Sequence, residues 1–394
     1  MKKVLLVVMI LLLISGCDDM KKDNKDNPSK EKKTMTIDEK VDQKLKEMTI
    51  EQKIAQMLIV YYSKDEVDSN LKNVFTTNTP GGFILMGDNI TTYERTKKMV
   101  DDLKKLSDVP LIISIDQEGG NVQRLKSMLD KEITNIPYMY NLGLKNDLNL
   151  TYEIGKIMAY ELRTIGVNVD YAPVADIYSN PNNPVIGKRS FGTNKEIVSN
   201  HSVKLAQGLE DNKVIATYKH FPGHGDTDVD SHESLPIINK TYDELKEEEL
   251  VPFKNAINNN AKIIMVGHLA LPKITGSNIP ASLSKKIVTD ILKNDLGYNG
   301  LVITDALNMG ALTKNYSDEE IYVGAINAGC DLLLMPNGSK KAIEIIKKNI
   351  SEERINESVK KILKFKYTYL DEDNTLDESY IGKQEYRNII NQIK

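Results

Sequence analysis

Short runs of apolar and β-branched residues alternate with longer amphipathic stretches along most of this chain. Such short runs are typical of buried strands. Eight are present, at residues 57–60, 82–86, 111–115, 167–171, 214–218, 262–266, 301–304 and 331–335. Apolar residues recur with helical spacing between them, most clearly at residues 152–165, 195–209, 242–258 and 284–296. Eight strands with intervening helices predict an α/β fold formed by a single (β/α)8 TIM-type barrel.

Helix-start signals agree with this alternation. Thr49 and Gln52 have the spacing of a capping box, in which the two side chains satisfy backbone amides at the start of a helix. We expect the barrel domain to occupy residues 36–370. The remaining residues, 371–394, are polar with one weakly amphipathic piece, so they predict a polar C-terminal tail or helix.

The N-terminus has the pattern of an export signal. Lys2 and Lys3 precede an apolar run at residues 4–14, which is too short to span a bilayer. Small residues directly before Cys17 resemble a bacterial lipobox. This resemblance implies a lipoprotein signal peptide at residues 1–16 and lipid attached to Cys17, with an ordinary cleavable signal peptide as the alternative.

Residues 17–35 consist almost entirely of polar residues after Cys17, which predicts a disordered linker behind the lipidated cysteine. The mature protein is then expected outside the cytoplasm, anchored by lipid to the bacterial cell membrane. The second of the two cysteines is Cys330. Once Cys17 carries lipid, no intramolecular disulfide is available, so the fold has to be held by burial.

Charge and composition restrict the partners. The formal net charge is −4, and acidic and basic residues are interspersed, so no basic patch indicates a nucleic acid partner. Tryptophan is absent, which counts slightly against broad polysaccharide binding. We expect a monomer whose partners are a small substrate and the membrane.

Chemistry is concentrated in residues 219–232, Lys-His-Phe-Pro-Gly-His-Gly-Asp-Thr-Asp-Val-Asp-Ser-His. This segment holds three of the five histidines, one lysine and three aspartates. It follows the apolar run that forms the fifth predicted strand. A loop at the end of a buried strand is the usual position for catalytic residues in an α/β protein. The segment therefore favours an enzyme.

Other unusual polar residues also follow predicted strands. They are Asp116 and Glu118 after the third, Arg189 beyond the fourth, Lys219 and His220 at the end of the fifth, His268 after the sixth and Asp305 after the seventh. In a barrel all of these positions lie on one face, where the loops build the active site. Asp305 taken alone is equally consistent with a helix N-cap.

Four motifs together resemble family 3 glycoside hydrolases, and more narrowly the NagZ-type β-N-acetylglucosaminidases. They are Asp116-Gln117-Glu118-Gly119-Gly120-Asn121-Val122-Gln123-Arg124, Gly187-Lys188-Arg189-Ser190-Phe191-Gly192, the segment 219–232, and Gly300-Leu301-Val302-Ile303-Thr304-Asp305-Ala306. The resemblance covers residues 48–336. It implies cleavage of terminal N-acetylglucosamine from cell-wall-derived or related glycosides, with the leaving group left open.

The resemblance also implies a mechanism. Asp305 corresponds to the nucleophile of a retaining double displacement, His232 to the acid/base, and Asp230 to the residue that orients the histidine ring. An imidazole with an ordinary pKa near 6.5 is able to donate a proton in the first step and accept one in the second.

Sugar-binding roles follow from the same resemblance. They fall on Asp116, Arg124, Arg189, Lys219, His220 and His268. For His268 and Glu118, support of neighbouring side chains is an open alternative to sugar contact. His224 and Asp226 are expected to stabilise the loop, and His201 to be a packing or surface residue. Asn121 departs from the family pattern, which more often has arginine there.

Three other interpretations remain. A metal-dependent barrel hydrolase would use His220, His224 and His232 as ligands, although Pro222 and Gly223 make a helix there implausible. A phosphorylase with the same mechanism is chemically possible, because a neutral histidine does not repel phosphate. A sugar-binding lipoprotein would not need a nucleophile opposite an acid. We expect hydrolysis without a metal or another cofactor.

Overall fold

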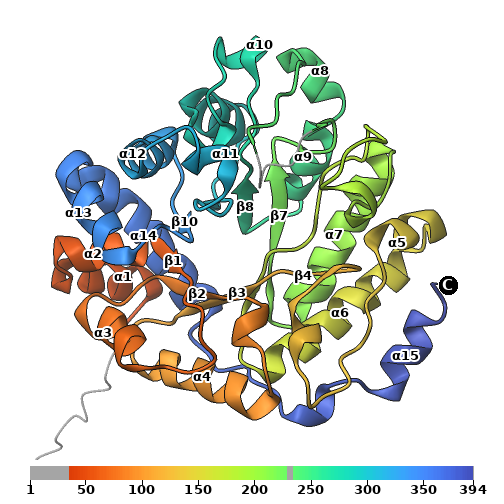
Figure 1. Ribbon diagram of the computed structural model, residues 1–394, viewed down its shortest axis with the longest axis horizontal. Coiled ribbons are helices and arrows are strands. Elements are labelled where there is room, and N and C mark those ends of the chain that lie inside the picture. Colours follow the sequence, from red (N-terminus) through yellow and green to blue (C-terminus); the bar gives the residue numbers. More distant parts are fainter. Residues whose placement is uncertain (1–34, 229–233, 394) are drawn as a thin grey trace, which may run out of the picture. The chain divides into compact units, whose positions relative to one another are not determined.

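The computed structural model describes residues 35–228 and 234–393, and every element below belongs to the unit Ile37–Lys394. Eight parallel strands form one sheet in the order β10-β1-β2-β3-β6-β7-β8-β9 (Figure 1). Their bounds are β1 Leu58–Val60, β2 Gly82–Leu85, β3 Ile112–Ile115, β6 Val169–Asp170, β7 Ile215–Phe221, β8 Ile263–Val266, β9 Leu301–Thr304 and β10 Leu333–Leu334. A parallel bridge between Ile303 in β9 and Leu332, just before β10, joins the two edges of the sheet. The predicted single (β/α)8 barrel is confirmed.

Helices surround the sheet (Figure 1). The α-helices are α1 Ile37–Glu47, α2 Ile50–Gln56, α3 Ser69–Thr77, α4 Tyr93–Lys105, α5 Met139–Lys145, α6 Leu148–Thr164, α7 Lys195–Asp211, α8 Tyr242–Glu247, α9 Leu250–Asn258, α10 Pro272–Thr275, α11 Gly310–Thr313, α12 Asp318–Ala328, α13 Ser339–Asn349, α14 Glu352–Tyr369 and α15 Gln384–Ile390. Short 3-10 turns are η1 Gly87–Asn89, η2 Arg124–Ser127, η3 Gly187–Arg189, η4 Ala281–Leu283 and η6 Glu378–Tyr380. Among the described helices, none is both long and apolar enough to cross a membrane.

Two of the predicted helices differ in form from the expectation. The stretch 242–258 is divided into α8 and α9. In an unbroken helix the ring of Pro252 would clash with the backbone carbonyl of Glu248, four residues earlier. The stretch 284–296 forms a π-helix, η5, at Lys286–Asp295. The capping box at Thr49 and Gln52 is present at the start of α2.

The strands are buried along their whole length, which places the core inside the barrel and between the sheet and its helices. Strand residues such as Phe83, Ile113 and Val302 are fully buried. Cys330 is also buried, and burial raises the pKa of its thiol to about 12. The core therefore holds through apolar contact, without a disulfide among the described residues.

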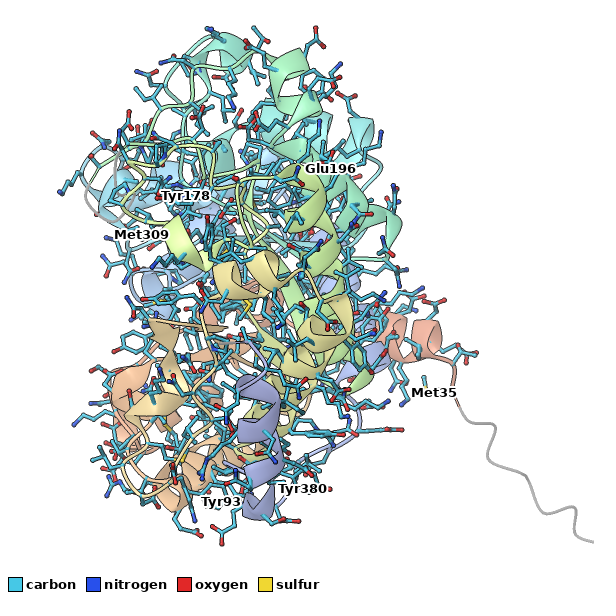
Figure 2. The ribbon with its side chains drawn as sticks, turned by 90° about the vertical axis from the view of Figure 1, so that its right-hand side faces the viewer. Met35, Tyr93, Tyr178, Glu196, Met309 and Tyr380 are labelled. Carbon is cyan, nitrogen blue, oxygen red and sulfur yellow. The ribbon has the colours of Figure 1, made fainter. Side chains whose placement is uncertain are left out.

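Two further parts of the chain complete the fold. A short antiparallel hairpin, β4 Gln117–Gly119 and β5 Val122–Gln123, follows β3 and carries the first motif. After α14 the chain continues alongside α6, where the ring of Tyr380 packs edge-on against Tyr160 at 5.4 Å. In Figure 2, Tyr380 lies close to Tyr93, and Lys131 contacts the Tyr93 ring as well as Glu378.

Candidate active site

The carboxyl ends of the strands bring most of the predicted polar residues into one pocket. Its charged and imidazole side chains are Asp116, Glu118, Arg124, Arg189, Lys219, His220, His224 and Asp305. The apolar lining includes four methionines, Met86, Met265, Met309 and Met335. The barrel thus places together residues that are almost 200 positions apart in sequence.

An ion-pair network forms the charged side of this pocket. The ammonium of Lys219 lies 2.6 Å from a carboxylate oxygen of both Asp116 and Glu118. The guanidinium of Arg189 donates from Nε and Nη2 to the two oxygens of Glu118, each at 2.7 Å. A bidentate pair of this kind fixes both the position and the plane of the guanidinium. Arg124 Nη2 approaches Asp116 at 3.6 Å.

Mutual pairing keeps this network ionised although it is buried. Glu118 is only 2% exposed, and burial alone would raise its pKa. Arg189 and Lys219 outweigh that effect and hold the pKa of Glu118 far below its ordinary value. Burial alone would likewise lower the pKa of Lys219, but Asp116 and Glu118 raise it instead. The pocket therefore presents ionised groups that hold one another in place.

Asp305 stands at the tip of β9. Its backbone amide donates to the carbonyl of Val266 on β8, and its carboxylate accepts the amide of Ala306 at 2.7 Å. Burial would raise the pKa of Asp305, but the nearby histidines His220 and His268 and the Ala306 amide lower it. A carboxylate that is ionised and held at a strand tip is suited to nucleophilic attack.

His220 is oriented by a residue that the sequence analysis missed. Asp176 accepts a bond from Nδ1 of His220 at 2.7 Å, and it also accepts the backbone amides of His220 and His224. Burial would raise the pKa of Asp176, but His220 outweighs it and lowers that pKa. Asp176 lies shortly after β6, so the rule that selected Asp116 and Asp305, an acid just beyond a strand, also applies to it.

His268 is placed behind the pocket rather than in its lining. Its Nδ1 is 2.8 Å from the hydroxyl of Ser282, and its Nε2 is 3.1 Å from the carbonyl of Ala306. Both ring nitrogens are thus engaged by the protein next to Asp305. Of the two roles left open for His268, this geometry supports the one in which it holds the Asp305 loop.

The loop after β7 is tightly anchored where it is described. A Cβ on Gly225 would lie 1.5 Å from the carbonyl oxygen of Ile177, so only glycine fits. Asn183 donates to the carbonyls of His224 and Gly225. His224 is buried against Thr227, and burial lowers its pKa to about 4.

Two of the predicted catalytic residues, Asp230 and His232, lie outside the described residues, as does Cys17. Asp226, which was expected to stabilise the loop, faces Lys240 at 3.4 Å. His201 lies outside the pocket, fully buried in α7, with Nδ1 2.7 Å from the hydroxyl of Thr151. Asn121 is exposed in the turn of the β4–β5 hairpin.

No group of three histidine, cysteine, aspartate or glutamate side chains is arranged to hold a metal ion within residues 35–228 and 234–393. The rings of His220 and His224, proposed as ligands in one interpretation, are 5.8 Å apart and almost perpendicular. One nitrogen of His220 is already bonded to Asp176. The third ligand of that interpretation, His232, lies outside the described residues.

Known proteins resemble this chain in sequence and fold. A family model described as the glycosyl hydrolase family 3 N terminal domain matches residues 49–365. The chain is 33% identical over 282 residues to β-hexosaminidase A of Pseudoalteromonas piscicida, covering 67% of this chain and 47% of that protein. It is 33% identical over 272 residues to a β-hexosaminidase of Nitrosomonas eutropha, covering 68% and 76%. The chain thus spans about half the length of the first relative and about three quarters of the second.

A solved structure gives the same result. A glycoside hydrolase family 3 β-N-acetylglucosaminidase from a Paenibacillus species superposes with a TM-score of 0.82 at 35% sequence identity. The superposition covers 88% of this chain and 68% of that one.

Proposed function

This chain belongs to glycosyl hydrolase family 3, and from that membership we propose that it is a retaining β-N-acetylglucosaminidase. Its substrates are glycosides with a terminal N-acetylglucosamine, derived from the cell wall or related to it. The observation that carries the proposal is Asp305, an ionised carboxylate at a strand tip that shares one pocket with the buried network of Asp116, Glu118, Arg189 and Lys219. β-Hexosaminidases are the relatives that this chain resembles.

The reaction proceeds in two displacements. Asp305 attacks the anomeric carbon, the glycosidic bond breaks, and His232 gives its proton to the departing oxygen. A water then loses a proton to His232 and attacks the same carbon, and the bond to Asp305 breaks. Asp230 orients the imidazole between the two steps. The roles of His232 and Asp230 rest on the family resemblance, because both residues lie outside the described residues.

Binding of the sugar uses the two unlike sides of the pocket. Asp116, Arg124, Arg189 and Lys219 supply charged donors and acceptors for adjacent hydroxyl groups, which favour charge-assisted hydrogen bonds. His220, held by Asp176, presents its other ring nitrogen. The methionines give an apolar surface for carbon-bound hydrogens and for the acetyl methyl group.

The test is hydrolysis of an aryl β-N-acetylglucosaminide by protein that lacks residues 1–17, in buffer with a chelator and without phosphate. We expect release of the phenol with retention of configuration. Asp305→Asn should lower the rate at least about 10⁴-fold, because the nucleophile is lost. Activity that needs added zinc, or that needs phosphate as the acceptor, would contradict the proposal.

The proposed location follows the N-terminal pattern. Residues 1–16 act as a lipoprotein signal peptide, Cys17 carries lipid, and the rest of 17–35 is a linker to the barrel at residues 36–370. The protein then lies on the outer side of the bacterial cell membrane, and we expect it to be a monomer. Cys17→Ser should leave an unlipidated precursor, whereas the wild type should partition with membranes. An intact wild-type protein found wholly in the culture medium would contradict the anchor.

A further inference from the structure

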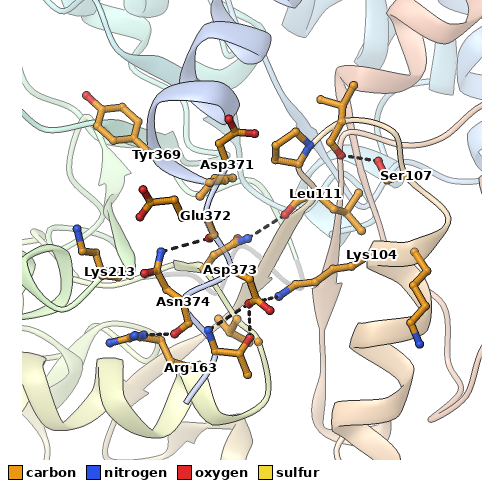
Figure 3. A pocket seen from close by; sticks show the side chains of 18 of the residues that line it. Lys104, Ser107, Leu111, Arg163, Lys213, Tyr369, Asp371, Glu372, Asp373 and Asn374 are labelled. Carbon is orange, nitrogen blue, oxygen red and sulfur yellow. Dashed lines mark hydrogen bonds and ion pairs between the residues drawn. The ribbon is translucent and has the colours of Figure 1, made fainter. Parts of the chain in front are cut away.

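Residues 371–393, called here the C-terminal segment, lie beyond the region that the family model matches, which ends at residue 365. The segment leaves α14 and crosses the barrel end opposite the active site. There Arg163 on α6 donates from Nε to the carbonyl of Asn374 at 2.6 Å, and Lys104 lies 3.9 Å from Asp373 (Figure 3). Leu376 returns a backbone hydrogen bond to Arg163. The segment is thus fastened to α6 at its start.

A buried carboxylate fastens the segment a second time. Glu161 on α6 is 1% exposed, and its Oε1 accepts the backbone amide of Gly382 at 2.9 Å. The same oxygen accepts both the amide and the hydroxyl of Thr134, at 3.0 and 2.6 Å. One atom therefore joins three parts of the chain, namely α6, the C-terminal segment and the stretch that follows the β4–β5 hairpin.

Thr134 is connected to the hairpin through Ile136 and Gln123. Ile136 donates its amide to Oε1 of Gln123, and Gln123 donates from Nε2 to the carbonyl of Ile136 at 2.8 Å. The amide of Gly120, in the hairpin turn, donates to the same carbonyl. A Cβ on Gly120 would lie 2.2 Å from the ring of Tyr138, so the hairpin has direct contact with this stretch.

The hairpin carries part of the charged side of the pocket. Glu118 lies in β4, and Arg124 follows β5 directly. A shift of the hairpin therefore moves the partner of Lys219 and Arg189. Side chains in a binding site have to be held within about 0.5 Å of their working positions. The contacts that hold the hairpin therefore affect whether the ion-pair network is already formed before the substrate binds.

We infer that the C-terminal segment is a positioning element of the active site, acting through Glu161, Thr134 and Gln123 on the hairpin that carries Glu118 and Arg124. The inference rests on the proposed sugar-binding role of that hairpin. Glu161 is the joint of the connection. The donors to its Oε1 are two backbone amides and a hydroxyl, all neutral, so an amide oxygen at the same place should serve as well as the carboxylate.

The test uses Gly382→Ala in the full chain, which displaces the segment where it packs against the stretch before Thr134. Gly382 has φ +58, and a Cβ there would lie 2.0 Å from the carbonyl oxygen of Glu132. Gly297→Ala is the matched control, because Gly297 has φ +73 with nothing within 4 Å of a Cβ. The control carries the same backbone strain without the clash.

We expect the Gly120 amide of Gly382→Ala to exchange its hydrogen about tenfold faster than in the wild type, because a hydrogen-bonded support is lost. KM for the aryl glycoside should rise about tenfold, with kcat within about twofold, since binding and not attack is disturbed. Glu161→Leu should behave like Gly382→Ala, and Glu161→Gln like the wild type. The control should leave all three quantities unchanged.

A lower melting temperature in Gly382→Ala, with unchanged Gly120 exchange and unchanged KM, would overturn the inference and leave the segment a purely stabilising role. Hydrogen exchange needs no substrate, so it decides the matter even if the proposed activity is absent. If neither variant folds, the wild type is measured in low urea. The Gly382 and Gly120 amides should then open with one common free energy, and separate openings would overturn the inference.

Discussion

Two buried lysines at opposite ends of the barrel have opposite pKa shifts. Lys219, at the carboxyl end of β7, lies 2.6 Å from Asp116 and from Glu118, and these carboxylates raise its pKa although burial opposes them. Lys366, on α14, is fully buried near the amino end of β1 and donates to the amide oxygen of Gln56 at 2.7 Å. Burial lowers its pKa to about 7.

The opposite pKa shifts of the two lysines show what allows a buried lysine to serve as a charged group of the pocket. Burial acts on both lysines, so the pKa is decided by what each ammonium meets. Two carboxylates make Lys219 a permanent cation at a pocket. The neutral amide that Lys366 meets leaves it titrating close to pH 7, where a charge in the core costs stability. Among the described residues, burial is the sole cause of the shift in the pKa of Lys366.

Among the substitutions that test this comparison, Lys219→Met should have the largest effect. The variant should lose about 10³-fold in kcat/KM, because a donor aimed at the substrate disappears and two carboxylates are left facing each other. Steady-state kinetics with the aryl glycoside measure the loss, and circular dichroism confirms that the variant is folded. A folded variant that retains activity within tenfold of the wild type would remove Lys219 from the site.

Glu118→Gln should have the next largest effect. Arg189 and Lys219 stay buried without the carboxylate that pairs directly with both, and only Asp116 and the more distant Asp176 remain to offset their charge. The free energy of unfolding should therefore fall by about 3 kcal/mol. kcat/KM should fall by about 10²-fold. Denaturant unfolding and kinetics measure the two quantities. An unchanged stability would mean that Glu118 is not the centre of the network.

Lys366→Met should change stability in the opposite direction. It should raise the free energy of unfolding at pH 7 by about 2 kcal/mol, because a desolvated amine is replaced by an apolar side chain while Gln56 loses one partner. The activity should stay the same. Unfolding in urea measures the gain, and a destabilised variant would show that the bond to Gln56 outweighs burial.

The pH dependence of that gain has a definite sign. The folded pKa of Lys366, about 7, lies below the 10.5 of an ordinary lysine. Between these values the unfolded chain binds more protons than the folded one, so the wild type should gain stability as pH rises. The advantage of Lys366→Met should shrink over the same window. Parallel curves for the two proteins would contradict the assigned titration.

Asp373→Asn should have the smallest effect and is the control for Glu118→Gln. Asp373 lines the pocket at the far end of the barrel, where its side chain is 76% exposed and 3.9 Å from Lys104 (Figure 3). An exposed pair of this kind contributes little, so the free energy of unfolding should change by less than about 0.5 kcal/mol. A loss similar to that of Glu118→Gln would mean that burial does not explain the different contributions of the two carboxylates to stability.

Much of the fold could be predicted from the sequence, because short apolar runs mark buried parallel strands directly. All eight predicted strand positions contain strands. The division between α8 and α9 was missed because Pro252 sits within an otherwise regular helical pattern. Lys366 was missed for a related reason, since lysine in an amphipathic helix normally marks its solvent side.

The sequence predicted which residues belong to the candidate site better than it predicted which of them bind one another. Residues that follow strands could be placed on one face by topology, and six of the seven singled out in this way line one pocket, whereas His268 lies behind it. The partner relations depend on three-dimensional distance, which spacing does not give. Asp176 under His220, and Glu161 joining Thr134 to Gly382, are visible only once the chain is folded.

The order of the strands divides the pocket into two parts that can be altered separately. The ion-pair network comes from β3 to β7 and the loops between them, whereas the methionines come from β8, β9, β10 and β2. Protein engineering can therefore vary Met86, Met265, Met309 and Met335 as a library without touching a charged group. Such a library could change the substrate preference while Asp305 and the ion-pair network stay unchanged.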